Sequence, residues 1–169
     1  PQKLEIQINE LHNSSFDFTI CQTIVFDVAA NKEIGLRAPK LRSENIFEDY
    51  ILFNIFWLTG APFWKRTFIN KHRLTFDEKL QQAQDYDFHM RVLSISQNYF
   101  HNEAPLVYFL IHNSNMSNSM LDTKEKIYSN AKVFRNIVIN YSTSLNDTIV
   151  LETFKKLLSF YREALRQRQ

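Results

Sequence analysis

Glycine is nearly missing from this chain: Gly35 and Gly60 are the only two among 169 residues. Loops that cradle a nucleotide phosphate, of the P-loop or Gly-x-Gly-x-x-Gly kind, need two or three glycines within a few residues. Two glycines that lie far apart cannot make either loop. We therefore do not expect this chain to hold a phosphate with a glycine-rich turn.

Size and charge are those of an ordinary globular chain, with 44% apolar and 22% charged residues. The net charge of +2, from 20 basic and 18 acidic residues, is too balanced to predict a nucleic-acid partner. The single cysteine, Cys21, can form neither an internal disulfide nor a cysteine zinc site. We expect it to be a small buried side chain in a reducing compartment, the cytoplasm.

No targeting or membrane-spanning segment is recognisable. The most apolar stretch, 50–64, is too short and too interrupted by polar residues to span a bilayer. The sequence starts at Pro1, inside a segment with a helical pattern. This start suggests a truncated or processed product.

The first 120 residues mix strand and helix patterns. Periodicity and turn signals predict helices at 3–11, 44–56, 65–71 and 81–97, and strands at 16–28, 34–37 and 106–111. This order predicts an α/β fold in which helices flank a mixed sheet.

The last fifty residues are helical throughout. Helices are predicted at 122–141 and 147–168, and the short link 142–144 favours an antiparallel pair. Asn146 or Asp147 could cap the second helix. Its apolar stripe consists of Leu151, Phe154, Leu157, Leu158, Tyr161 and Leu165. We place a boundary at the change in character and predict two parts, 1–120 and 121–169.

An acidic cluster, Gln84-Asp85-Tyr86-Asp87, falls near the predicted start of a helix. One interpretation is capping, because carboxylates favour the positive end of the helix dipole. The other is a positioned general base, which needs a fixed direction and partial shielding from water.

Two tryptophans, Trp57 and Trp64, flank a turn that contains Thr59 and Gly60. Indole faces can stack on sugar rings, although both tryptophans could equally be core residues. Gly60 could serve a positive φ or a close backbone approach. His112 ends an apolar strand before a polar loop, which suggests either a structural histidine or a metal or phosphate contact.

Three separate segments carry a family resemblance. They are TGAPFWKR at 59–66, LTFDEKL at 74–80 and QDYDFHMR at 84–91. Their order and spacing resemble the second half of family 2 glycosyltransferases of the GT-A fold. The opening helix and the stretch 106–117 are also similar to that family, so the resemblance covers about residues 1–118.

The resemblance implies an inverting transfer of a sugar from a nucleotide-sugar donor to a saccharide or lipid-linked acceptor. Asp85 would be the general base. The residues implied on the acceptor side are Trp57, Thr59, Gly60, Trp64, Gln84 and Asp87. A divalent metal, Mn²⁺ or Mg²⁺, would bind the diphosphate in the complete enzyme, and His112 would lie near it.

The sequence departs from the family pattern at Gln84, where glutamate is common, and at Leu110, where arginine is frequent. The nucleotide-binding half and its metal-binding Asp-x-Asp motif are not in the sequence. We therefore expect a partial GT-A-like fold, the acceptor-side part of an enzyme of surface polysaccharide synthesis. Alone it would be inactive and would bind no metal, and in the cell it would work in the cytoplasm at the inner face of the membrane.

The alternative is a non-catalytic helical interaction module or a membrane-peripheral module. The last helix carries a set of basic residues, Lys155, Lys156, Arg162, Arg166 and Arg168. Beside an apolar stripe such residues suit an anionic membrane surface. They also suit a solvated face on a helix packed against its own domain, which is the interpretation that we favour.

Overall fold

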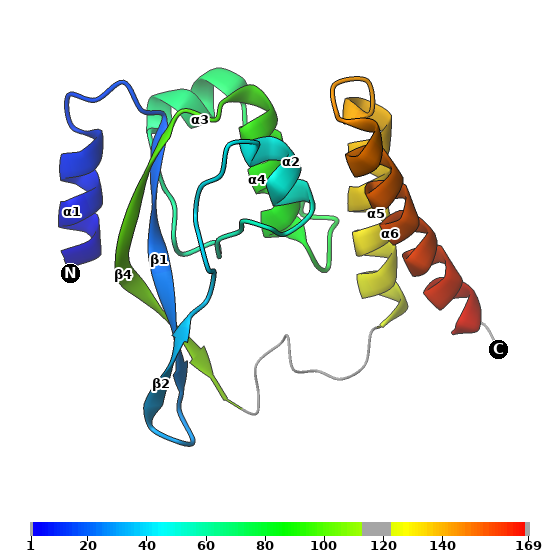
Figure 1. The fold of residues 1–169 in the computed structure, drawn as a ribbon, viewed down its shortest axis with the longest axis horizontal. Helices are drawn as coiled ribbons and strands as arrows, with labels where there is room; N and C mark the ends of the chain where they lie inside the picture. Colours follow the sequence, from blue (N-terminus) through cyan, green and yellow to red (C-terminus); the bar gives the residue numbers. More distant parts are fainter. Residues whose placement is uncertain (1, 113–122, 168–169) are drawn as a thin grey trace.

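The structure, a computed structural model, describes residues 2–112 and 123–167. They form an α/β fold in which helices flank a four-stranded sheet and a helix pair follows (Figure 1). The strands are β1 (Phe18–Asp27), β2 (Lys32–Leu36), β3 (Phe63–Trp64) and β4 (Tyr99–Ile111). The helices are α1 (Gln2–Leu11), α2 (Ile46–Ile51), α3 (Arg66–His72), α4 (Gln84–Ile95), α5 (Lys124–Tyr141) and α6 (Asp147–Arg166).

β1 is the centre of the sheet, because each of the other strands pairs with it. β4 runs parallel to β1 along its full length, while β2 and β3 are antiparallel and share the other edge. β4 has 13 residues against 10 in β1, and register shifts beside Gln22 absorb the difference. Pro105, which has no N–H to donate, lies in this irregular region.

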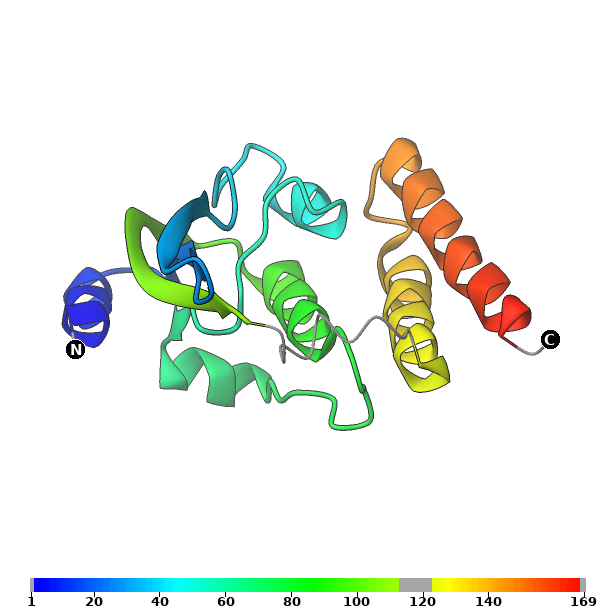
Figure 2. The same cartoon turned by 90° about the horizontal axis from the view of Figure 1, so that it is seen from below.

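The sheet lies between α1 on one side and α2 with α4 on the other (Figure 2). The side chains of Phe18 and Tyr99 are stacked at 5.0 Å between ring centroids and are fully buried. Trp57 joins them at 5.6 Å from Tyr99. Cys21 is also fully buried, as predicted, and burial raises the pKa of its thiol. An aromatic core therefore connects the sheet to α2 and α4.

Several predicted elements are confirmed, and three differ from the prediction by several residues. The helix at 44–56 is only Ile46–Ile51, because the chain turns into a left-handed conformation at Phe53. The helix at 81–97 begins at Gln84, after a left-handed Ala83. The strand at 106–111 extends back to Tyr99, through polar residues and a proline that obscure its pattern.

The helix pair packs onto the rest of the chain. Lys132 Nζ lies 2.6 Å from Asp77 Oδ2, and Phe134 packs on Tyr86 at 5.8 Å. The predicted boundary between 1–120 and 121–169 falls outside the described residues. On either side of it, the buried residues belong to one continuous core.

The predicted stripe of α6 does not face the domain. Of its six residues only Leu157 is buried, and α6 packs inward with Thr153 and Ala164 instead. The helix does pack against its own domain, as expected, but the buried face includes only Leu157 of the stripe. Periodicity shows that one face of a helix is apolar, but it does not show which face meets a neighbour.

Asn146 caps α6, because its side chain accepts a hydrogen bond from the Thr148 N–H at 2.8 Å. We expect Asn146→Ala to lower the free energy of unfolding by about 1 kcal/mol in urea denaturation. Asn146→Asp, which keeps the acceptor, should retain most of the stability. Equal stability of the wild type and the alanine variant would show that the cap contributes nothing.

Candidate functional site

Asp85 is the second residue of α4, and both of its carboxylate oxygens have hydrogen-bond donors. Oδ1 accepts the N–H of Tyr86 at 2.8 Å, and Oδ2 accepts the hydroxyl of Thr59 at 3.0 Å. The N-cap position belongs to Ala83, and no side chain caps the helix there. Asp85 is thus held by the first turn and by the loop after Trp57, and it is not the N-cap. Each oxygen keeps a lone pair for a ligand.

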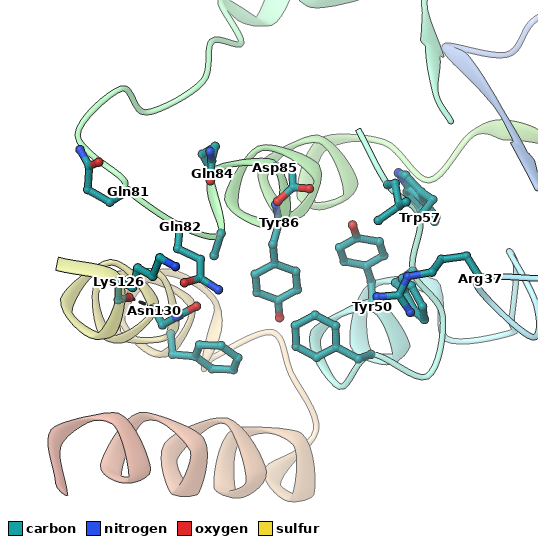
Figure 3. A pocket seen from close by; sticks show the side chains of 15 residues that line it. Arg37, Tyr50, Trp57, Gln81, Gln82, Gln84, Asp85, Tyr86, Lys126 and Asn130 are labelled. Atoms are coloured by element: carbon teal, nitrogen blue, oxygen red, sulfur yellow. Dashed lines mark hydrogen bonds between the residues drawn. The ribbon is translucent and has the colours of Figure 1, made fainter. Parts of the chain in front are cut away.

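A pocket of about 710 Å³ opens beside Asp85, between α2, the start of α4 and α5 (Figure 3). Its polar lining consists of Arg37, Gln81, Gln82, Gln84, Asp85, Lys126 and Asn130. Its aromatic lining consists of Tyr50, Phe53, Phe56, Trp57, Tyr86 and Phe134. A pocket of this size, with one carboxylate among amides and aromatic rings, suits a polar organic ligand.

A buried hydrogen bond lies behind Asp85. Tyr50 Oη and His89 Nδ1 are 2.8 Å apart, and His89 follows Asp85 by one helical turn. Burial lowers the pKa of His89 to about 4, although the charge of Asp85 opposes the shift. Burial, and then the charge of Asp85, raise the pKa of Tyr50 well above its ordinary value. Both groups are therefore neutral at pH 7.

Phe53 has an unusual backbone for an aromatic residue. The Phe53 N–H donates to the Tyr50 carbonyl at 3.2 Å and the Asn54 N–H to the Asp49 carbonyl at 2.8 Å. These two bonds form a Schellman motif, whose left-handed position glycine usually occupies. Phe53 adopts a φ of 61° there. Its ring stacks on Tyr86 at 4.6 Å and remains 49% exposed in the pocket wall.

Four predicted site residues meet at or beside the pocket. Asp85, Gln84 and Trp57 line it, and Thr59 binds Asp85. Gly60 is adjacent to Thr59, but it does not have the positive φ considered from sequence. A Cβ at Gly60 would touch the Val107 side chain at an ordinary 3.7 Å. Neither a positive φ nor a close backbone approach therefore explains the glycine at this position.

Three other predicted residues lie away from the pocket lining. Trp64 packs in the core, 4.6 Å from Phe18 between ring centroids. Asp87 is buried and forms an ion pair with Arg91 at 2.8 Å. His112 directly follows β4 and is not among the lining residues.

The resemblance also implied a metal. Within residues 2–112 and 123–167, no group of three or more His, Cys, Asp or Glu side chains could hold one. His112 therefore belongs to no group of this kind.

Sequence reasoning missed several lining residues. Phe53 carries no motif, and its significance depends on a backbone conformation that a sequence pattern does not show. Lys126, Asn130 and Phe134 are four residues apart on one face of α5, a spacing that was visible in the sequence. What the spacing could not show is that this face meets the start of α4.

The burial of His89 predicts acid sensitivity. Its pKa is lower in the folded protein, about 4, than the ordinary 6.5, so the unfolded chain binds the extra proton. Stability should be complete above pH 6.5 and should fall as the pH drops toward 4, by up to about 1.4 kcal/mol per pH unit. Urea denaturation at pH 7 and pH 5 measures this difference. His89→Gln should reduce it, whereas the exposed control His12→Gln should not. An unchanged difference in His89→Gln would contradict the assignment.

The left-handed backbone at Phe53 predicts that a glycine variant is more stable there than an alanine variant, the reverse of the order inside a helix. Phe53→Gly should be more stable than Phe53→Ala by about 1 kcal/mol, because only alanine is strained at this φ. At Leu151, an exposed position inside α6, alanine should be the more stable by about the same amount. Thermal or urea denaturation of the four variants tests this. If the alanine variant were the more stable one at both positions, the backbone at Phe53 would not be strained.

Comparison of the sequence with models of protein families gives no match, and comparison with curated proteins gives none either. The interpretation of the pocket therefore depends on its own geometry and on the sequence motifs.

Proposed function

We propose that this chain is the acceptor-side part of a family 2 glycosyltransferase with a GT-A fold, acting in surface polysaccharide synthesis. One observation carries the proposal: the carboxylate of Asp85 is held at the wall of a pocket by the Thr59 hydroxyl and the Tyr86 N–H. Thr59 and Asp85 come from two of the three segments that resemble the family. Their direct contact supports a common role.

Asp85 acts as the general base in this proposal. Its carboxylate takes the proton of an acceptor hydroxyl, and the hydroxyl oxygen forms a bond to the anomeric carbon of the nucleotide-sugar. The bond from that carbon to the diphosphate breaks, and its electron pair leaves with the nucleoside diphosphate. Attack from the opposite side inverts the anomeric centre. Hydrogen bonds from Thr59 and Tyr86 keep the carboxylate in one orientation, as a base requires.

The pocket walls support a saccharide, free or lipid-linked, as the acceptor. The exposed ring of Phe53, stacked on Tyr86, offers an aromatic surface for the C–H face of a sugar ring. Gln82 and Asn130 lie on one side of the pocket and Arg37 on the opposite side (Figure 3). Amides can both donate to and accept from hydroxyl groups, which suits a sugar with alternating hydroxyls.

The donor and its metal belong to the complete enzyme. The divalent metal, Mn²⁺ or Mg²⁺, would supply charge stabilisation for the departing diphosphate. Within the described part of this chain, no group of three or more His, Cys, Asp or Glu side chains could hold it. The roles proposed here for Asp85, Thr59 and Phe53 concern the acceptor alone.

The test is sugar transfer by a protein in which this chain follows a nucleotide-binding half, with Mn²⁺ or Mg²⁺ present. Asp85→Asn keeps the shape of the side chain but cannot take the proton, so kcat should fall about 10²–10⁴-fold. Asp77→Asn changes a carboxylate that pairs with Lys132 outside the pocket and should retain activity. Full activity of Asp85→Asn would exclude Asp85 as the base.

A further inference from the structure

α6 exposes a continuous row of large apolar side chains. The row consists of Leu151, Phe154, Leu158, Tyr161 and Leu165, whose exposed fractions are 53, 45, 39, 41 and 61%. Its members alternate at intervals of three and four residues, so they follow one side of the helix over about 21 Å. α6 is the outermost helix at this end of the molecule, and α5 lies between it and the sheet (Figures 1 and 2). The row is therefore free of the chain's own core.

Three cations form a rim along one edge of this apolar row. Each of the three directly follows a row member: Lys155 follows Phe154, Arg162 follows Tyr161 and Arg166 follows Leu165. They are seven and four residues apart, so they lie along one edge of the row. Lys155 and Arg166 contact Glu152 and Glu163 at 2.7 and 3.5 Å. Arg162 has no acidic partner among the residues that the structure describes.

The opposite edge of the row adjoins the buried face of α6. Leu157 and Ala164, which are buried, come directly before the row members Leu158 and Leu165. Around its circumference the helix thus has one side against α5, one that is apolar and exposed, and one that carries the three cations together with Glu152 and Glu163. An exposed apolar face with cations beside it is typical of amphipathic helices that lie in the plane of a lipid–water boundary.

We propose that α6 docks this chain onto an anionic membrane surface, with the apolar row in the acyl boundary and the basic rim at the lipid headgroups. Long basic side chains can keep their charge at the headgroups while their stems cover apolar surface. Within the described part of the chain, none of the helices has the length and apolar character needed to cross a bilayer. The orientation of α6 in this proposal is along the surface.

A second copy of the chain fits the row less well. Antiparallel pairing of two α6 helices through their rows would bring Lys155 of one copy toward Arg162 of the other. Like charges at such positions oppose pairing. Negative lipid headgroups complement the same rim, so charge favours a lipid surface over self-association.

The test is co-flotation of the whole chain with phosphatidylcholine vesicles, with and without phosphatidylglycerol. We expect binding to the anionic vesicles only, weakened by salt. Leu151→Ser with Leu165→Ser should weaken it at least about tenfold, and Arg162→Gln about fivefold. Because these side chains are exposed, circular dichroism and melting should stay as in the wild type. Ile34→Ser, an equally exposed apolar position on β2, is the matched control and should bind normally.

Three results would overturn the proposal. They are no flotation with anionic vesicles, equal flotation with neutral vesicles, and unchanged flotation of the double serine variant. Sedimentation velocity of the wild type and the double variant completes the test. A dimer that the double variant abolishes, without any vesicle binding, would assign the row to a second copy instead. None of these measurements requires sugar transfer, so the result is independent of the role of Asp85.

Discussion

The hydrogen bond between Tyr50 and His89 is the interaction on which the candidate site depends. It joins α2 to α4 inside the core at 2.8 Å, and both side chains are buried. Breaking it would leave two polar groups buried without a partner, which costs far more than a surface hydrogen bond. Trp57 packs on Tyr50 at 4.6 Å, and the same loop continues to Thr59 and its contact with Asp85. The orientation of the carboxylate therefore follows from the packing behind it.

The scarcity of glycine has a structural consequence that composition alone does not reveal. Turns that normally use glycine are made here by other residues, and Phe53 and Ala83 are two of those with a left-handed φ. Both line the pocket. Strained backbone is often found at functional sites. At Phe53 the strain keeps a half-exposed aromatic ring where glycine would leave none, which is why we include this ring in the proposed sugar site.

Local patterns predicted much of the fold, and long-range packing accounts for what they missed. The 3.6-residue period identified α1, α5 and α6, and the β-branched and aromatic run identified β1. The pairing of Thr59 with Asp85 agrees with the grouping suggested by the motifs. The contribution of α5 to the pocket and the outward direction of the α6 row could not be predicted. Both depend on which face of a helix meets a distant element, and periodicity does not specify this.

The central claim is that the oriented carboxylate of Asp85 faces an acceptor saccharide. The most direct measurement is a crystal structure of the protein with an oligosaccharide acceptor bound. The account predicts a sugar ring against Phe53 and one hydroxyl within about 2.6–3.2 Å of an Asp85 carboxylate oxygen. An acceptor bound elsewhere on the protein, or one whose hydroxyls all lie beyond reach of Asp85, would contradict it.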